Sequence, residues 1–201
     1  MSARLYASNA RSYLAAGYSP LPLPPGQKWP PPTGWTGTGA PMADLDQVRR
    51  WVRSDPAGNI ALRLPDDVIG IDLDLYPDPE KPHPDVERMA AWDAILSQLG
   101  PLPESPRATS RDDGISGIRL YRVPSGWKGA GDLPGAPVCE GHPRPDGREA
   151  RPGDLVSPGE VIQHHHRYLV APPSVHPSGR RYRWLGGNLP TVTSLPSLEG
   201  L

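Results

Sequence analysis

The sequence predicts an α+β fold, because segments with helical periodicity lie between segments with the alternation of β-strands. The length of 201 residues fits one domain or two tightly packed halves. A folded chain of this size buries roughly 70% of its unfolded surface, which is enough for a core without disulfides. The 29 prolines and 22 glycines are concentrated between the periodic segments, so we expect long, stiff loops around a globular core.

The composition excludes several kinds of site and location. Cys139 is the single cysteine, which rules out an internal disulfide and a cysteine-based zinc site. The first residues have no apolar run typical of a signal peptide, and no segment approaches the ~20 apolar residues of a membrane span. We therefore expect a cytoplasmic protein without membrane contact. The net charge of -1 does not by itself indicate nucleic acid, although it is compatible with a local basic groove.

The N-terminal segment predicts a helix followed by a strand. Residues 3–16 have apolar side chains at helical spacing, and Gly17 follows where a helix C-cap is expected. Residues 18–23 are then expected to form a short strand.

A loop follows, because PLPPGQKWPPPTGWTGTGAP at 22–41 is too rich in proline for regular structure. Lys28, Trp29 and Trp35 are prominent in this loop. They either pack a polyproline edge or present a cation and an aromatic ring toward a nucleotide or a nucleic-acid strand.

The next segments predict a helix and two strands. Residues 44–53 have acidic side chains in the first turn, an apolar stripe, and arginines near the end, all of which favour a helix with a solvated basic face. Residues 59–64 and 68–76 alternate like strands, and Pro65-Asp66-Asp67 between them is a turn signal. We expect the two strands to form a hairpin.

The second half of the chain adds one helix and further strands. Residues 85–99 have apolar side chains at helical spacing and are followed by the stop signal of Gly100 and Pro101. Extended structure is expected at 108–123, at 159–171 as two strands or one bent strand, and at 181–185. Residues 124–158 have no periodic pattern, and a loop of about 35 residues indicates function or mobility.

The sequence VIGIDLDLY at 68–76 is central to the functional prediction. Alternate side chains of a strand point to opposite faces, so Asp72 and Asp74 share one face while apolar residues fill the other. The two positions lie about 6.5 Å apart, and their carboxylates can converge on cations that prefer oxygen ligands. This arrangement suits phosphoryl transfer with two ions roughly 3.5–4 Å apart. The alternative is a strand end with solvated aspartates.

A two-ion site needs a third acidic ligand, and a nucleoside triphosphate needs cations. Glu160, at the start of a strand with core-like alternation, is the strongest acidic candidate, while Asp132 and Asp154 in loops are weaker. Arg119 suits phosphate because its planar guanidinium can bond two oxygens at once. A solvent-facing arginine is the alternative.

The run of three histidines could form a metal site with at most two of its members. Adjacent positions of a strand face opposite ways, so at most His164 and His166 converge on one metal. His166 and His176 are instead candidates for donating to phosphate or backbone, which leaves His164 and His165 at the surface.

Four separated segments occur in an order that is typical of one family. They are PLPPGQKWPP with GWTG, NIALRLPDDVIGIDLDLY, TSRDDGISGIRLYRVP, and GEVIQHHHRYLVAPPSVHPSGRRYRW. From residue 17 to residue 184 the chain resembles the N-terminal primase/polymerase (prim-pol) domain of the archaeo-eukaryotic primase superfamily, found in phage and plasmid replication proteins. The resemblance implies a catalytic sheet related to the RNA-recognition motif, joined to an N-terminal α/β unit. We expect a prim-pol domain at 1–185, with an N-terminal part at 1–58 and a catalytic core at 59–185, and a tail or linker to a further domain at 186–201.

The resemblance also implies roles for individual residues. Asp72, Asp74 and Glu160 match the acidic ligands of the catalytic Mg²⁺ or Mn²⁺ ions. The family's second motif has a small residue, any residue and a histidine that contacts the triphosphate, and here Gly117-Ile118-Arg119 places arginine in the histidine slot. Further expected nucleotide-binding residues are Lys28, Ser116, His166, Arg167, Ser174 and His176.

The implied activity is template-directed, divalent-metal-dependent nucleotidyl transfer that makes and extends primers in DNA replication. Its partners would be a single-stranded DNA template, a primer, nucleoside triphosphates and a fused or separate helicase. Two alternatives stay open. A rolling-circle (HUH) nickase would use His164 and His166 as metal ligands and Tyr168 or Tyr182 as nucleophile. A non-catalytic module would bind template for a replication helicase, with salt-sensitive affinity.

Overall fold

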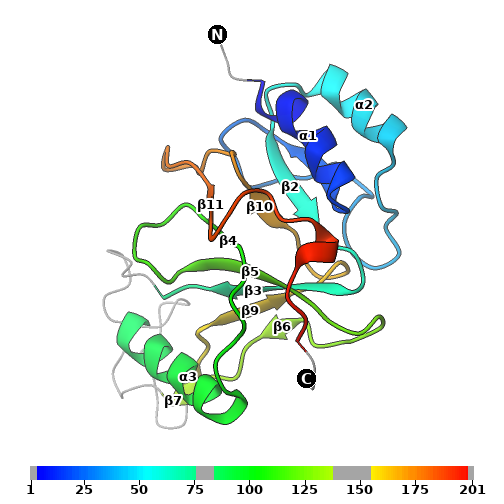
Figure 1. Ribbon diagram of the computed structural model, residues 1–201. Coiled ribbons are helices and arrows are strands. Elements are labelled where there is room, and N and C mark those ends of the chain that lie inside the picture. The colour runs from blue at the N-terminus through cyan, green and yellow to red at the C-terminus, as the bar shows by residue number, and fades with distance from the viewer. Residues whose placement is uncertain (1–3, 76–83, 138–154, 199–201) are drawn as a thin grey trace.

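The computed structural model describes residues 4–75, 84–137 and 155–198 and stacks them in four layers (Figure 1). The outer layer on one side contains the helices α1 (Leu5–Ala15) and α2 (Leu45–Ser54). These helices cover an antiparallel sheet, here called the small sheet, with the strand order β1 (Ser19–Leu23), β2 (Asn59–Arg63) and β10 (Leu169–Ala171).

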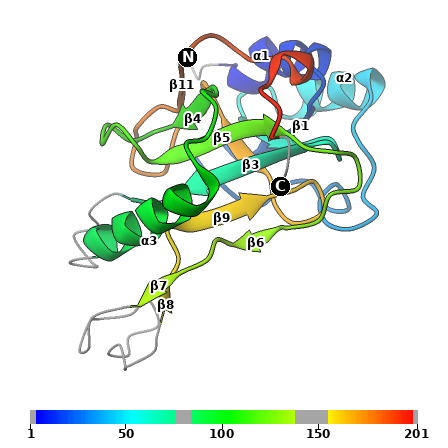
Figure 2. The ribbon, with the colours of Figure 1, turned by 60° about the horizontal axis from the view of Figure 1, so that its bottom comes forward.

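The third layer is a six-stranded antiparallel sheet, here called the large sheet. Its strand order is β11 (Arg183–Leu185), β4 (Arg107–Thr109), β5 (Gly117–Arg122), β3 (Val68–Leu73), β9 (Gly159–Ile162) and β6 (Gly131–Asp132). Helix α3 (Pro84–Leu99) is the fourth layer and covers the face of the large sheet that points away from the small sheet (Figure 2). The other described elements are the strand pair β7 (Ala136–Pro137) and β8 (Leu155–Val156), and the 3₁₀ helix η1 (Val192–Ser194).

Two hydrophobic cores hold these layers together. The first core surrounds the small sheet and includes Tyr6 of α1, Trp51 of α2 and Leu120 of β5. The second core lies between the large sheet and α3, around Ile71 and Trp92. The large sheet is therefore packed on one face by α3 and faces the small sheet with the other.

The predicted helices agree with the structure to within two residues at each end. The Asp44 side chain accepts the Gln47 N–H at 2.7 Å, which satisfies one of the free amides at the start of α2. After α1 the chain turns at Gly17, whose φ of +98° favours glycine. Among the described residues, no helix is long and apolar enough to cross a membrane.

The predicted hairpin between residues 59–64 and 68–76 is wrong. Strand β2 belongs to the small sheet and β3 to the large sheet, and the turn that starts at Pro65 carries the chain from one sheet to the other. Each strand already has a neighbour on both edges, so neither has a free edge to offer the other. Sequence proximity favoured the hairpin, but four long-range pairings, two for each strand, replaced it.

Residues 124–158 also differ from the prediction of one loop without pattern. The described part of this segment contains the short strands β6, β7 and β8, and β6 extends the large sheet beside β9. A strand of two residues leaves no periodic signal in a sequence. Residues 159–171 form two strands in different sheets, which is one of the two predicted alternatives. Cys139 and Asp154 lie outside the described residues.

Residues 186–198, the described part of the segment that we predicted to be a tail or linker, pack against the domain. Leu195 is buried in the first core and Leu198 in the second. The Leu198 N–H donates to the Arg122 carbonyl at 2.9 Å, and the Val192 N–H donates to the Ala16 carbonyl at 2.8 Å. Isolated leucines between prolines have no period, which is why the sequence pattern indicated a linker.

Candidate active site

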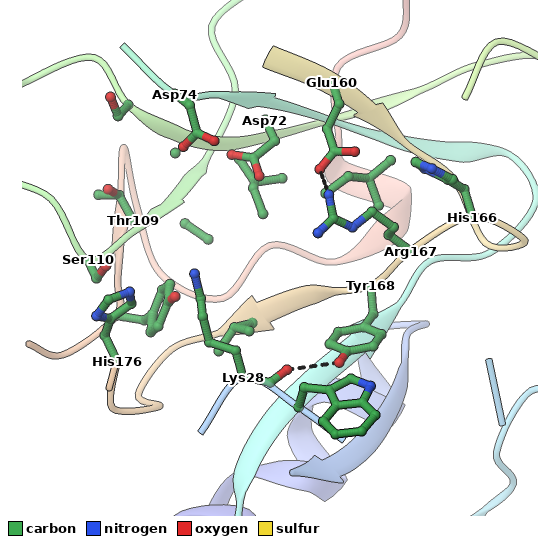
Figure 3. Close-up of a pocket in the computed structure, with 18 of the residues that line it drawn as sticks. Lys28, Asp72, Asp74, Thr109, Ser110, Glu160, His166, Arg167, Tyr168 and His176 are labelled. Atoms are coloured by element: carbon green, nitrogen blue, oxygen red, sulfur yellow. Dashed lines mark hydrogen bonds and ion pairs between the residues drawn. The ribbon is translucent and has the colours of Figure 1, made fainter. Parts of the chain in front are cut away.

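A pocket of about 630 Å³ opens on the face of the large sheet opposite α3 (Figure 3). The large sheet contributes residues of β3, β4, β5 and β9 to its wall. The proline-rich loop at 24–43 contributes a second wall, and the segments before and after β10 contribute a third. Segments far apart in sequence therefore meet at one site.

Three carboxylates lie in this pocket. Asp72 of β3 is directly opposite Glu160 of β9 on one side and Ile118 of β5 on the other, so these side chains share a face of the sheet. Asp74 follows two residues after Asp72 and also lines the pocket. Figure 3 shows all three carboxylates along one side of the same space. The predicted shared face of the two aspartates is confirmed.

Two glycines allow the strands to come this close. A Cβ at Gly159 would lie 1.8 Å from the Asp72 carbonyl oxygen, so any side chain there would push β9 away from β3. Gly117 has a φ of +124°, and a Cβ there would lie 2.6 Å from the Ala108 carbonyl oxygen. The backbone at both positions therefore requires glycine.

The negative charges of the neighbouring carboxylates, together with burial, disfavour the ionised form of Asp72. Burial raises the pKa of Asp72 to about 7, and the negative charges of Asp74 and Glu160 add to this rise. Arg167 and Lys28 act in the opposite direction on the same pKa. A partly buried acid among acids is the environment in which a bound cation would relieve the most repulsion.

The third acidic residue is engaged by a cation of the chain itself. The Arg167 guanidinium donates to the Glu160 carboxylate, and Figure 3 shows the two side chains turned toward each other. In the described part of the chain, no three His, Cys, Asp or Glu side chains are grouped closely enough to hold a metal ion. The chemistry of the donors still fits hard divalent cations, because three carboxylates offer oxygen ligands from two adjacent strands.

Two side chains that can donate hydrogen bonds, Lys28 and His176, lie across the pocket from the carboxylates. In Figure 3 the Lys28 side chain extends from the proline-rich loop toward the space below Asp72. The Tyr168 hydroxyl donates to the Lys28 carbonyl at 2.8 Å and holds this part of the loop in place. His176 also lines the pocket, and burial together with Lys28, Arg111 and Arg180 lowers its pKa. His176 is therefore a neutral hydrogen-bonding group near neutral pH.

Two predicted serines have different positions. Ser116 lines the pocket, and its Oγ accepts the Leu75 N–H at 3.0 Å, next to the aspartates. Ser174 is fully buried outside the pocket wall, where its Oγ accepts the Ile60 N–H at 2.8 Å. The prediction that Ser174 contacts nucleotide therefore needs correction, because this hydroxyl joins the chain after β10 to the small sheet.

The prediction that Arg119 faces the triphosphate does not agree with its position. In the ladder of β3 and β5, Arg119 lies opposite Ile71, on the face that α3 covers, whereas Ile118 lies opposite Asp72. The Arg119 guanidinium donates to the Ile115 carbonyl at 3.0 Å, and burial lowers its pKa. The strand register thus brings an isoleucine to the carboxylates and turns the arginine away.

Of the residues that a nickase would use, only some line the pocket. His166 lines the pocket, whereas His164 does not and instead makes an edge-to-face contact with His165. Tyr168 and Tyr182 both line the pocket, but the Tyr168 hydroxyl is bonded to the Lys28 carbonyl. Among the described residues the two histidines do not form a joint metal site, because residues 164–166 form a turn and not a strand along which side chains alternate.

Some pocket residues were missed at the sequence level. Thr109, Ser110 and Arg111 line the pocket where β4 ends. Trp29, which the sequence had already singled out together with Lys28, lines it as well. The sequence signal was a pair of hydroxyl residues followed by Arg111, the first residue of the RDDG turn. Its value became clear only once β5 was known to pair with β3.

Comparison with known proteins gives one family. A family model described as "Bifunctional DNA primase/polymerase, N-terminal" matches residues 10–198. The match covers every segment that contributes to the pocket. No curated protein and no solved structure matches the chain.

Proposed function

The chain belongs to the bifunctional DNA primase/polymerase N-terminal family, and on this premise we propose that it extends and starts DNA strands on a template. The reaction is transfer of a nucleotidyl group from a nucleoside triphosphate to a 3′-hydroxyl, with pyrophosphate as the leaving group. The substrates are then a single-stranded DNA template, a primer and nucleoside triphosphates. We further infer that the large sheet is the counterpart of the family's catalytic sheet, which is related to the RNA-recognition motif.

One observation supports this proposal most strongly. Asp72, Asp74 and Glu160 share one wall of a pocket whose other walls carry Lys28 and Arg167. Nucleotidyl transfer requires anionic groups for divalent ions and cationic groups for a triphosphate within the length of one ligand. The pocket brings together the carboxylates of the large sheet and the cations of the neighbouring loops.

The carboxylates would hold Mg²⁺ or Mn²⁺. When bound, such ions lower the pKa of the attacking 3′-hydroxyl and neutralise the charge of the triphosphate. The chain's part is to fix three carboxylates on strands β3 and β9, which pack against α3 on their other face. The pKa of Asp72, raised to about 7 by burial and its acidic neighbours, is expected to fall when cations bind.

The cationic groups would orient the triphosphate. Lys28 and Arg167 are the two cations that act on the carboxylates, since the positive charge of each lowers the pKa of Asp72. Arg167 would leave Glu160 for a phosphate oxygen when a cation takes over the carboxylate, because the guanidinium suits both partners. His166, His176 and the Ser116 hydroxyl are the further candidates for contact with nucleotide.

Primer extension tests this function directly. The full chain is incubated with a primed single-stranded template, all four deoxynucleotides, and Mg²⁺ or Mn²⁺, and product length is measured. The Asp72→Ala/Asp74→Ala variant is expected to lose synthesis by at least about 100-fold, because the ions lose two ligands.

A matched control removes another pair of aspartates. Asp66 and Asp67 lie in the turn before β3 and bond Ser125 and Arg122 outside the pocket wall. The Asp66→Ala/Asp67→Ala variant should keep synthesis within about twofold of the wild type. Equal loss in both variants would mean that the pocket carboxylates have no special role.

A second candidate function is a non-catalytic module that binds template DNA. Two observations favour it: Arg119, in the slot of the family's histidine, lies on the face covered by α3 rather than in the pocket, and Arg167 already pairs with Glu160. This candidate expects salt-sensitive binding of single-stranded DNA and no metal-dependent synthesis. The extension assay, run beside a DNA-binding titration of the same protein, separates the two candidates.

A further inference from the structure

Trp29 is the most exposed of the large apolar side chains in the described part of the chain. It is 72% exposed, although a buried aromatic ring removes some 150–250 Å² from water. The other five of the six tryptophans pack in or against one of the two cores. Trp29 instead lines the pocket that contains the carboxylates.

The backbone around Trp29 is held from outside the loop. The Tyr168 hydroxyl donates to the carbonyl of Lys28, and the side-chain amide of Asn59, fully buried at the start of β2, donates to the carbonyl of Gln27 at 2.9 Å. The three prolines that follow, residues 30–32, restrict the chain on the other side. A fixed backbone presents the exposed ring at one place on the pocket rim.

We propose that Trp29 stacks on the base of the incoming nucleoside triphosphate. This inference rests on the proposed function and adds the subsite for the base. Every base has a π-face, so an aromatic ring can bind all four without reading sequence. A template-directed enzyme needs such a contact, because base pairing rather than the protein must choose the nucleotide.

The neighbouring residue favours the nucleotide over the template strand as the partner. Lys28 extends toward the carboxylates where the triphosphate would lie (Figure 3). Consecutive Cα atoms are about 3.8 Å apart, so Lys28 and Trp29 act within the span of one nucleotide. The charged end of the ligand is then held by Lys28 and the aromatic end by Trp29.

Calorimetric titration separates the two contributions. The full chain is titrated in Mg²⁺, without template or primer, with deoxyguanosine triphosphate and with inorganic tripolyphosphate, which has no base. Trp29→Ala should weaken binding of the nucleotide about tenfold and leave tripolyphosphate binding unchanged. Trp29→Phe should restore most of the nucleotide affinity, whereas Lys28→Ala should weaken binding of both ligands.

Leu99→Ala is the matched control, because Leu99 is also exposed, at 60%, but lies at the end of α3 on the other side of the large sheet. It should bind both ligands like the wild type. Unchanged nucleotide affinity in Trp29→Ala would overturn the inference, and weakened binding of single-stranded DNA in that variant would assign Trp29 to the template. If the wild type binds neither ligand, the proposed function fails as well, so the two failures are distinguishable.

Discussion

The two faces of strand β3 are built for opposite purposes. On the α3 side, Ile69, Ile71 and Leu73 are all at most 6% exposed and form part of the second core. On the pocket side, Asp72 and Asp74 meet Glu160, and the pKa of Asp72 is raised to about 7. Residues that are neighbours in sequence thus belong to a dry core and to a charged pocket.

This difference shows where the stability of the site comes from. Three carboxylates held together repel one another, and the pocket face therefore destabilises the strands that carry it. The packed face offsets this cost, because burial of its apolar side chains holds β3, β5 and β9 in register. Substitutions on the packed face should mainly change stability, whereas substitutions on the pocket face should mainly change binding and catalysis.

The largest effect on stability is expected on the packed face. Leu73 is fully buried between the two aspartates, and Leu73→Ala would leave a cavity in the second core. We expect the free energy of unfolding to fall by about 4 kcal/mol in urea titrations. Leu99→Ala, at an exposed site of α3, should change it by less than about 0.5 kcal/mol. A stable Leu73→Ala variant would contradict the division between the faces.

A buried charged side chain whose hydrogen bonds are all made within the chain should, like a core residue, destabilise the fold when it is replaced. Arg63 of β2 is 3% exposed, and its guanidinium donates to the carbonyls of Gly37, Ala40, Pro41 and His164. Arg63→Met would leave these carbonyls without their donor and should destabilise the fold by about 3 kcal/mol. Thermal unfolding measures this loss. An unchanged melting temperature would show that water replaces the guanidinium.

Removing a charge from the pocket should raise the free energy of unfolding, whereas the two substitutions above lower it. The pKa of Asp72 in the folded protein, about 7, lies above its ordinary value, so the folded state holds an extra proton between about pH 4 and pH 7. The stability linked to Asp72 is therefore present below this window and is lost as the pH rises through it. In metal-free buffer, Asp72→Asn should raise the free energy of unfolding by about 2 kcal/mol near pH 8.

The same variant should gain little near pH 4, at the lower edge of this window, because the Asp72 carboxyl is neutral there in the folded protein and no charge is left to remove. Unfolding in urea at the two pH values, with a chelator present, gives the comparison. A gain of equal size at both would mean that the charge of Asp72 is not its cause.

The smallest effect on stability is expected for Arg167. Its ion pair with Glu160 is 59% exposed on the arginine side, and exposed pairs contribute less than about 1 kcal/mol. Arg167→Gln should nevertheless change binding, because Glu160 is released for a cation. We expect Mn²⁺ affinity without nucleotide to rise about threefold in calorimetry, and nucleotide affinity to fall. Weaker Mn²⁺ binding would contradict competition between Arg167 and the cation.

Local pattern predicted much of this fold. The three helices follow from apolar spacing and capping residues such as Asp44, and the shared face of Asp72 and Asp74 follows from strand alternation. Both depend on neighbours within a few residues, where the sequence determines geometry directly. Strand alternation also made Glu160 the strongest candidate for the third acidic ligand, and the family resemblance pointed to the same residue, but only the pairing of β3 with β9 places it opposite Asp72.

Features that depend on long-range pairing could not be predicted in this way. Alternation placed Arg119 and Ile118 on opposite faces, but only the register with β3 shows which of them faces Asp72. The false hairpin of β2 and β3 has the same origin, since each strand found distant partners on both edges. The role of Ser174 was hidden because its bond reaches β2 from the far end of the chain.

Direct binding of Mn²⁺ is the measurement that bears most closely on the charged face. Electron paramagnetic resonance can follow free Mn²⁺ during titration of the wild type and of Asp72→Asn/Glu160→Gln, with and without deoxynucleotide. We predict that the wild type binds Mn²⁺, more tightly with nucleotide, and that the double variant loses at least about tenfold in affinity while staying folded. Equal Mn²⁺ binding by both proteins would contradict the assignment of these carboxylates to metal.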